Sequence, residues 1–166
     1  GAVLMAQITF RPYRRDDKHD CVGMFDANCP AFFAPNERAG YEAYLDRVPA
    51  SYEVCEVDGR VSGGFGIANT GDGASVISWI LLSPDVQGMG IGSQVMYRVI
   101  QKSRTWNATL VRIATSPKAA DFFARFGAVR RSTTKDGWGP GMDRVDMELP
   151  LPPQSSRDAR NFTPGR

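Results

Sequence analysis

The sequence predicts a single α/β (α+β) domain over residues 1–149, with about seven strands and with helices between them. The main observation is an apolar run at 79–82, a glycine-rich turn at 87–92 and a helical pattern after it, which together predict strand, turn and helix. Turn dipeptides upstream predict an antiparallel meander that leads into this unit. Two apolar runs before residue 149 predict a closing pair of strands.

Length and composition fit one globular domain. The chain has 166 residues, 42% of them hydrophobic and 23% charged, which is ordinary for a soluble protein with a substantial core. No apolar run could span a membrane, and the first residues lack the features of a secretory signal. We expect Met5 to be the native start and residues 1–4 to be an addition. Residues 150–166, rich in Pro, Ser and Arg, predict a flexible tail.

Charge and cysteine content narrow the function classes. The net charge is +2, and the tail accounts for it, since residues 150–166 carry three arginines against one aspartate. A neutral body gives no indication of a nucleic-acid partner. Three cysteines without motif spacing predict free thiols in a reducing cytoplasm, and one histidine argues against a His-rich metal site, so we expect no metal.

The N-terminal third predicts one strand and two helices. Residues 8–13 form the strand, and three acids then suit a helix start that runs through Phe25. An apolar linker with two prolines, 29–35, follows. Asn36 can cap the second helix, whose apolar side recurs at Tyr41, Tyr44, Leu45 and Val48.

Three successive strands should follow. Residues 52–57 and 60–68 flank Asp58-Gly59, a dipeptide typical of hairpin turns. A second turn at 69–73 leads into the strand at 74–82. The three strands therefore predict an antiparallel meander that ends at the glycine-rich turn.

The glycine-rich turn predicts an anion site. Gly88, Gly90 and Gly92 stand directly before a helix whose apolar face contains Ile91, Val95, Met96, Val99 and Ile100. A helix start has backbone N–H groups without partners and a partial positive charge, and glycines let a phosphate approach. We expect a pyrophosphate over residues 88–93. The alternative is a tight turn without a ligand.

The C-terminal part predicts a strand, a helix and two strands. The strand is 110–114, and the helix starts near Thr115-Ser116-Pro117 with one apolar stripe of Ala119, Phe122, Phe123 and Phe126. Gly127 is placed to end it. Strands at 129–134 and 145–149 should flank a glycine-rich loop, 136–141, that carries Trp138.

Other phosphate motifs do not fit. The dinucleotide fingerprint needs glycine at Ser93 and an acid about 20 residues further on, whereas residues 106–116 contain none. A Walker loop needs a lysine after the glycines. The run 87–92 instead resembles the acetyl-CoA signature Q/R-x-x-G-x-G/A of the GNAT superfamily of N-acetyltransferases, met by Gln87, Gly90 and Gly92. Residues 120–128 are similar to that family's second stretch, A-x-x-F-Y-x-x-x-G-F.

The resemblance implies a mixed, mostly antiparallel sheet of about seven strands with helices on both faces. This sheet would be splayed in the middle, between the strands at 78–82 and 110–114, with acetyl-CoA as co-substrate in the gap. Backbone N–H groups of the turn would hold the pyrophosphate, and two strand residues would pair with the pantetheine arm. A bulge near these residues would aim an N–H at the thioester carbonyl. Phe123 stands where many members have a tyrosine acid. The cofactor-binding residues implied are Leu81, Leu82, Gln87, Gly88, Met89, Gly90, Ile91, Gly92, Ser93 and Phe123.

The implied reaction is transfer of an acetyl group to a primary amine of a small molecule or a protein, by direct attack in a ternary complex. Val76 occupies a position where some members carry a base glutamate. Glu53, Glu56 and Asp72, or water linked to one of them, are the remaining candidates for a base, and the sequence does not choose among them. Phe32, Phe33, Trp79 and Trp138 predict an apolar acceptor pocket. Phe32 and Phe33 can equally pack the linker onto the core, and Trp138 can be a structural lid.

Two other function classes stay open. Phe123 and Val76 also suit a non-catalytic acyl-CoA-binding sensor that uses the same fold. A nucleotide-binding α/β domain is disfavoured by Ser93 and by the upstream meander. We expect acetyl-CoA and an amine as partners, with neither nucleic acid nor membrane. Homodimers are common in such folds, and no stretch of this sequence decides for or against one.

Overall fold

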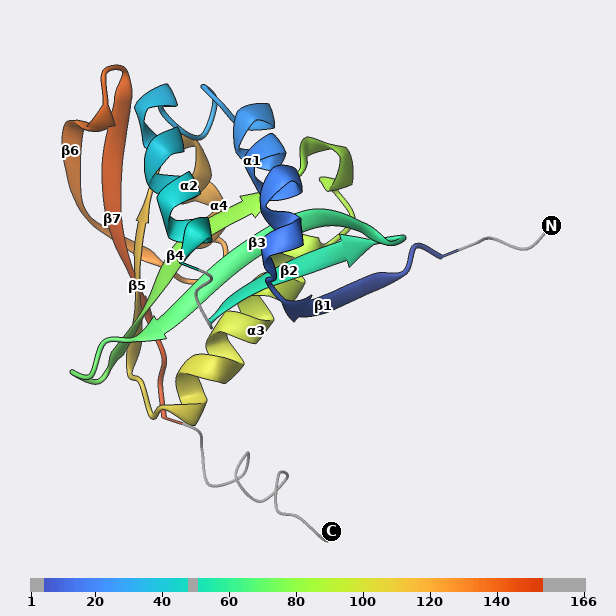
Figure 1. Ribbon diagram of the computed structural model, residues 1–166. Helices are drawn as coiled ribbons and strands as arrows, with labels where there is room; N and C mark the ends of the chain where they lie inside the picture. The colour runs from blue at the N-terminus through green and yellow to red at the C-terminus, as the bar shows by residue number, and fades with distance from the viewer. Residues whose placement is uncertain (1–4, 48–50, 154–166) are drawn as a thin grey trace, which may run out of the picture.

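The computed structural model describes residues 5–47 and 51–153, and it contains a seven-stranded mixed sheet (Figure 1). The strand order is β1-β2-β3-β4-β5-β7-β6, and only the central pair, β4 and β5, is parallel. This confirms the predicted sheet and its meander. The strands are β1 (Ile8–Pro12), β2 (Tyr52–Val57), β3 (Arg60–Asn69), β4 (Ala74–Leu82), β5 (Leu110–Thr115), β6 (Val129–Gly139) and β7 (Met142–Pro150).

The four helices cover both faces of the sheet. α1 (Lys18–Ala27) and α2 (Arg38–Asp46) lie on one face, and α3 (Ile91–Thr105) and α4 (Pro117–Ala124) lie on the other (Figure 1). Each face has its own buried core. The core under α3 and α4 is aliphatic with Phe65 and Phe123, whereas the core under α1 and α2 is rich in tyrosine. Three 3₁₀ turns complete the fold: η1 (Arg15–Asp17), η2 (Pro35–Glu37) and η3 (Pro84–Val86).

The acids predicted to start the first helix have a more specific role. Asp17 ends η1 directly before α1 and is 4% exposed. Its carboxylate accepts two hydrogen bonds from the Arg11 guanidinium, both 2.8 Å, and one from the Arg14 N–H at 2.9 Å. Burial alone would raise the pKa of Asp17, but these donors outweigh it and hold the pKa below its usual value. The ion pair between Arg11 and Asp17 therefore anchors the start of α1 to strand β1.

Asp17→Asn is expected to lower the free energy of unfolding by about 2 kcal/mol at neutral pH, because it removes charge-assisted hydrogen bonds from a buried site. Since the folded-state pKa is depressed, the contribution of Asp17 is present above its unfolded pKa of about 4 and is lost as pH falls further. Urea unfolding at pH 7 and pH 3 measures both effects. The difference between the two proteins should shrink at pH 3, and an equal difference at both pH values would contradict this role.

The predicted cap of the second helix is wrong. Asn36 lies inside η2, two residues before α2 begins, and its side-chain amide donates a 2.8 Å hydrogen bond to the backbone carbonyl of Trp138. An asparagine before an apolar repeat is typical of a cap, but here tertiary contact with β6 takes its side chain. Val48, assigned to the same helix, lies outside the described residues.

The predicted glycine-rich loop at 136–141 is also wrong, because most of it is strand. β6 continues to Gly139, and only Pro140 and Gly141 turn the chain into β7. Asp136 makes this possible: its N–H donates to the Asp143 carboxylate at 2.9 Å, and its own carboxylate accepts from the Gly141 N–H at 2.8 Å. The pairing register shifts between Thr134 and Gly139, and within this irregular part of the ladder the Trp138 indole donates to the Thr115 carbonyl of β5.

The described residues include Met5 and the first part of the predicted tail. Residues 1–4 and 154–166, to which the expected addition and most of that tail belong, are outside them. Within the described ranges, no helix combines the length and apolar character that crossing a membrane requires.

Candidate active site

The central cleft arises where the parallel strand pair separates. β4 and β5 pair only from Ala74–Val76 to Leu110–Arg112. Beyond these residues β5 stays with β7 as far as Thr115, while β4 stays with β3 as far as Leu82. The facing edges therefore open into a cleft of about 1090 Å³, which is lined by residues 77–82 of β4, 113–115 of β5, the glycine-rich turn and α4. This is the splay that the family resemblance implied.

The glycine-rich turn presents unpaired donors to the cleft. Gly88 and Gly90 have φ angles of +84° and +78°, and α3 begins at Ile91 directly after them. Among the described residues, none accepts a hydrogen bond from the N–H groups of Gly88 or Gly90, or of residues 91–93. Such a helix start binds anions through these donors and through the helix dipole. The geometry therefore fits a diphosphate.

The glycines of this turn have two different roles. A Cβ at Gly88 or Gly90 would meet no atom within 4 Å, so these positions need glycine for their backbone angles and leave open space above them. At Gly92 a Cβ would lie 2.8 Å from the Phe122 ring, so here glycine allows α3 and α4 to approach closely.

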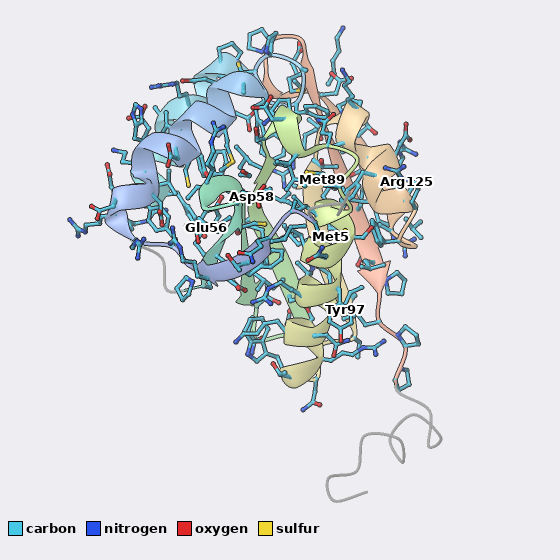
Figure 2. The ribbon with its side chains drawn as sticks, turned by 90° about the vertical axis from the view of Figure 1, so that its right-hand side faces the viewer. Met5, Glu56, Asp58, Met89, Tyr97 and Arg125 are labelled. Atoms are coloured by element: carbon cyan, nitrogen blue, oxygen red, sulfur yellow. The ribbon has the colours of Figure 1, made fainter. Side chains whose placement is uncertain are left out.

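Most of the predicted cofactor residues line the cleft. These are Leu81, Leu82, Gln87, Gly88, Gly90, Ile91, Gly92, Ser93 and Phe123. Met89 is not among the lining residues: its side chain is 37% exposed beside the start of α3, as Figure 2 shows. Phe123 borders the cleft but is only 2% exposed, and it packs into the core under α3 and α4. Figure 2 also labels Arg125, directly after α4, which is a further cation that lines the cleft.

Strand β4 carries a bulge inside the cleft. The β3–β4 register shifts between Gly64 and Gly66, and Trp79 has a φ of +49°, unusual for a bulky residue. In a regular strand Ile77, Trp79 and Leu81 would share one face. Here Ile77 packs with the core under α3 and α4, whereas Leu81 packs with the core under α1 and α2. The bulge therefore reverses the side-chain alternation and turns the backbone at Trp79.

A buried tyrosine holds the bulge. The Tyr52 hydroxyl donates a 2.7 Å hydrogen bond to the Trp79 carbonyl and lies 2.8 Å from the Tyr41 hydroxyl, which must then be the donor of that pair. A planar trans peptide points its N–H opposite to its C=O. The N–H of Ile80 therefore points away from Tyr52.

Two glycines of β3 make room for the tyrosines. A Cβ at Gly64 would lie 2.7 Å from the Tyr52 hydroxyl oxygen, and a Cβ at Gly66 would lie 2.7 Å from the Tyr44 hydroxyl oxygen. The glycines in the run Gly63-Gly64-Phe65-Gly66 thus allow aromatic rings to cross the strand beneath the bulge. The sequence pattern alone had no separate interpretation for them.

The predicted acceptor aromatics meet at one end of the cleft. Phe32, Phe33, Trp79 and Trp138 all line it, and the rings of Phe33 and Trp79 stack with centroids 6.3 Å apart. Trp138 is held at two points: its indole Nε1 donates to the Thr115 carbonyl at 3.0 Å, and its own carbonyl accepts from Asn36. A bridge from η2 to β6 therefore borders this end of the cleft.

The predicted candidates for a base are placed elsewhere. Glu53 pairs with Arg98, Glu56 with Arg11 at 3.4 Å, and Asp72 with Arg112 at 2.9 Å. None of the three carboxylates is among the residues that line the cleft. The structure therefore does not bring them together with the glycine-rich turn or the acceptor aromatics.

Sequence reasoning missed Glu37, which does line the cleft. It lies in η2, and its Oε2 accepts a 2.7 Å hydrogen bond from the Ala34 N–H. Burial raises the pKa of Glu37, and the hydrogen bond from Ala34 only partly opposes this. The only sequence signal is its position two residues after Pro35, where the apolar linker ends, which indicates a turn and says nothing about a cleft.

Within residues 5–47 and 51–153, no group of His, Cys, Asp and Glu side chains is placed to hold a metal ion. An opened sheet edge thus lies beside a helix start that can bind an anion, an arrangement that suits a long ligand headed by a diphosphate. Residues 21–128 match the model of the acetyltransferase (GNAT) family. The chain belongs to this family, whose members use acetyl-CoA, and this confirms the resemblance in the sequence.

Solved structures share the fold over most of both chains. Ard1 from Thermoplasma volcanium superposes with a TM-score of 0.74 at 17% identity, covering 88% of this chain and 99% of its own. The ribosomal-protein-S18-alanine N-acetyltransferase from Escherichia coli gives 0.71 at 11%, with 90% and 97% covered. yncA from Salmonella typhimurium, solved with its cofactor acetyl-CoA, gives 0.63 at 16%, again with 90% and 97% covered. At these identities the likeness concerns the fold.

Sequence relatives match over a shorter stretch. The uncharacterized N-acetyltransferase ycf52 of Pyropia yezoensis is 26% identical over 68 residues, or 40% of this chain, and its counterpart in Porphyra purpurea matches to the same extent. The match spans 39% of the length of each relative.

Proposed function

We propose that this protein is an N-acetyltransferase that moves the acetyl group of acetyl-CoA to a primary amine by direct attack within a ternary complex. The observation that carries the proposal is the position of the glycine-rich helix start at the mouth of the opened β4–β5 cleft. One site thus offers donors for a diphosphate and a free strand edge for the rest of the cofactor. The family supplies the co-substrate and the reaction class.

The chain's own residues suit each part of acetyl-CoA. The N–H groups of Gly88, Gly90 and residues 91–93 would bind the diphosphate. At Leu81 and Leu82, β4 pairs with β3 along one edge only, so the backbone groups on its other edge face the gap and can hydrogen-bond the pantetheine amides. The Leu82 carbonyl also accepts a 2.9 Å hydrogen bond from the Asn28 side chain. Because the Trp79 carbonyl is held by Tyr52, the Ile80 N–H points the opposite way and is the nearest bulge donor for the thioester oxygen.

The reaction forms an N–C bond, breaks the C–S bond and releases the thiolate of coenzyme A, while the amine loses a proton. An alkyl ammonium with a pKa of about 10.4 must lose one proton before attack, whereas a thiolate with a pKa of about 8.5 leaves readily without an acid. Phe123 has no proton to give, so the proposed mechanism uses no acid at that position. Deprotonation of the acceptor's ammonium group is therefore the main proton transfer that the reaction requires.

Ligand binding and turnover test the proposal separately. At a hundredfold excess over its Kd, acetyl-CoA should raise the free energy of unfolding by about 2.7 kcal/mol and the melting temperature by about 5 to 10 °C, whereas NAD and ATP should not. Release of free coenzyme A with a panel of amines then measures transfer. Tight acetyl-CoA binding without turnover of any amine would favour the sensor alternative, and stabilisation by NAD or ATP alone would overturn both.

A further inference from the structure

Glu37 is the acid of the cleft that has no ion-pair partner among the described residues. Two carboxylates line the cleft, Glu37 and Asp121. Asp121 pairs with Arg130 at 2.9 Å and its side chain is 82% exposed, so it is solvated and neutralised. Glu37 is partly buried, and its only described hydrogen bond comes from the Ala34 N–H. One oxygen of a carboxylate that faces the cleft thus remains for a ligand.

The surroundings of Glu37 make an unpaired charge costly. Removing a carboxylate from water without a partner is unfavourable, and an opposite charge at hydrogen-bond distance offsets that cost. Lys118, a cation that lines the cleft, forms no ion pair with Glu37 and instead lies with its Nζ 5.2 Å from the centre of the Phe32 ring. A ligand with its own positive charge would therefore give Glu37 the ion-pair partner that the described residues do not supply.

The adjoining walls of the pocket are flat and aromatic. Phe33 stacks on Trp79, and Trp79 also packs on Tyr41 with ring centroids 4.9 Å apart, so this wall is backed by the buried core. Across the pocket, Trp138 is fixed by its hydrogen bonds to Thr115 and Asn36. Rigid aromatic faces favour apolar planar groups and cations next to them.

The structure assigns Glu37 as the group that receives the ammonium of the acceptor, and the acceptor as a primary amine carried on a flat apolar body. The body would lie between Trp79 and Trp138, with its amine between Glu37 and the bulge of β4. This assignment rests on the proposed function for the identity of the site, but it concerns binding of the amine and can be measured without turnover.

A purely structural role for Glu37 predicts something different. If the carboxylate only accepts from the Ala34 N–H to stabilise η2, then Glu37→Gln should behave like the wild type, because the glutamine carbonyl accepts the same hydrogen bond. Glu42→Gln is the matched control: Glu42 pairs with Arg38 on α2 and does not line the cleft. Comparing Glu37→Gln with Glu42→Gln therefore isolates the effect of the negative charge at position 37 on ligand binding.

Calorimetric titration of the protein loaded with coenzyme A tests the assignment, with 2-phenylethylamine and its neutral analogue 2-phenylethanol as probes. The wild type and Glu42→Gln should bind the amine about ten- to a hundredfold more tightly than the alcohol. Glu37→Gln should lose that preference while keeping its melting temperature and its affinity for coenzyme A. Spermidine, a cation without a ring, should bind more weakly than 2-phenylethylamine.

Each other result overturns the assignment. It fails if the wild type binds neither probe, if the alcohol binds as tightly as the amine, if Glu37→Gln keeps the preference, or if spermidine binds best. Failure of the proposed function is a separate result: the amine would bind through Glu37, yet no acetyl group would be transferred from acetyl-CoA.

Discussion

Gly90→Glu is expected to abolish acetyl-CoA binding, with the Kd weakened by at least about a hundredfold. Gly90 caps α3 with a φ of +78°, and a side chain here would extend into open space over the unpaired N–H groups. A carboxylate in that space would occupy the proposed diphosphate position and repel its charge. Calorimetric titration with acetyl-CoA measures the loss.

Two controls separate charge from backbone strain. Any residue other than glycine at a positive φ costs about 1 to 2 kcal/mol, so the variant should fold but unfold somewhat earlier. Gly71→Glu has the same type of strain, since Gly71 has a φ of +81° in the β3–β4 turn and does not line the cleft. It should lose stability and keep its affinity. Gly90→Gln, equal in size but neutral, should bind acetyl-CoA more tightly than Gly90→Glu.

Unchanged affinity in Gly90→Glu would place the diphosphate elsewhere. The same would follow if Gly71→Glu weakened acetyl-CoA binding as much as Gly90→Glu does, because the effect would then come from general destabilisation.

Local features of the fold were predictable from the sequence. A glycine-rich turn between an apolar strand and an amphipathic helix is specified within 25 consecutive residues, 78–102, and the structure has strand, turn and helix there. The hairpin at Asp58-Gly59 is local in the same way, because the dipeptide itself favours the turn. The splay was implied only by the family resemblance, since no local pattern shows where two paired strands separate.

Features that depend on distant partners were not predictable. Asn36 has the right residue type for a helix cap, but β6, about a hundred residues away, supplies its acceptor. Asp136 and the glycines around it indicate a loop, yet Asp143 on the neighbouring strand keeps this segment in the sheet. Glu37 has no sequence pattern that marks it as a residue of the cleft. Only the tertiary structure shows that Glu53, Glu56 and Asp72 each pair with an arginine outside the cleft.

A second large effect, on kcat, is expected from a substitution that releases the bulge of β4. Tyr52→Phe is expected to lower kcat about ten- to a hundredfold while leaving the Kd for acetyl-CoA nearly unchanged. The substitution removes the hydroxyl that holds the Trp79 carbonyl and leaves that carbonyl without its described partner. The peptide between Trp79 and Ile80 could then rotate, and its N–H would lose its fixed direction toward the thioester. Tyr52 is thus a positioning residue, since it lies in the core under α1 and α2 and acts through the backbone.

Tyr41→Phe distinguishes positioning from loss of stability. The Tyr41 hydroxyl belongs to the same buried pair, so either substitution should lower the free energy of unfolding by about 1 to 3 kcal/mol. In Tyr41→Phe, however, Tyr52 still donates to the Trp79 carbonyl, and kcat should stay close to that of the wild type. Burial raises the pKa of Tyr52 well above its usual value, so its hydroxyl keeps its proton and the ratio of kcat values should not vary with pH. Equal losses of kcat in both variants would show that the core under α1 and α2 affects kcat only through stability. The proposal that the Ile80 N–H donates to the thioester oxygen would then lose its support.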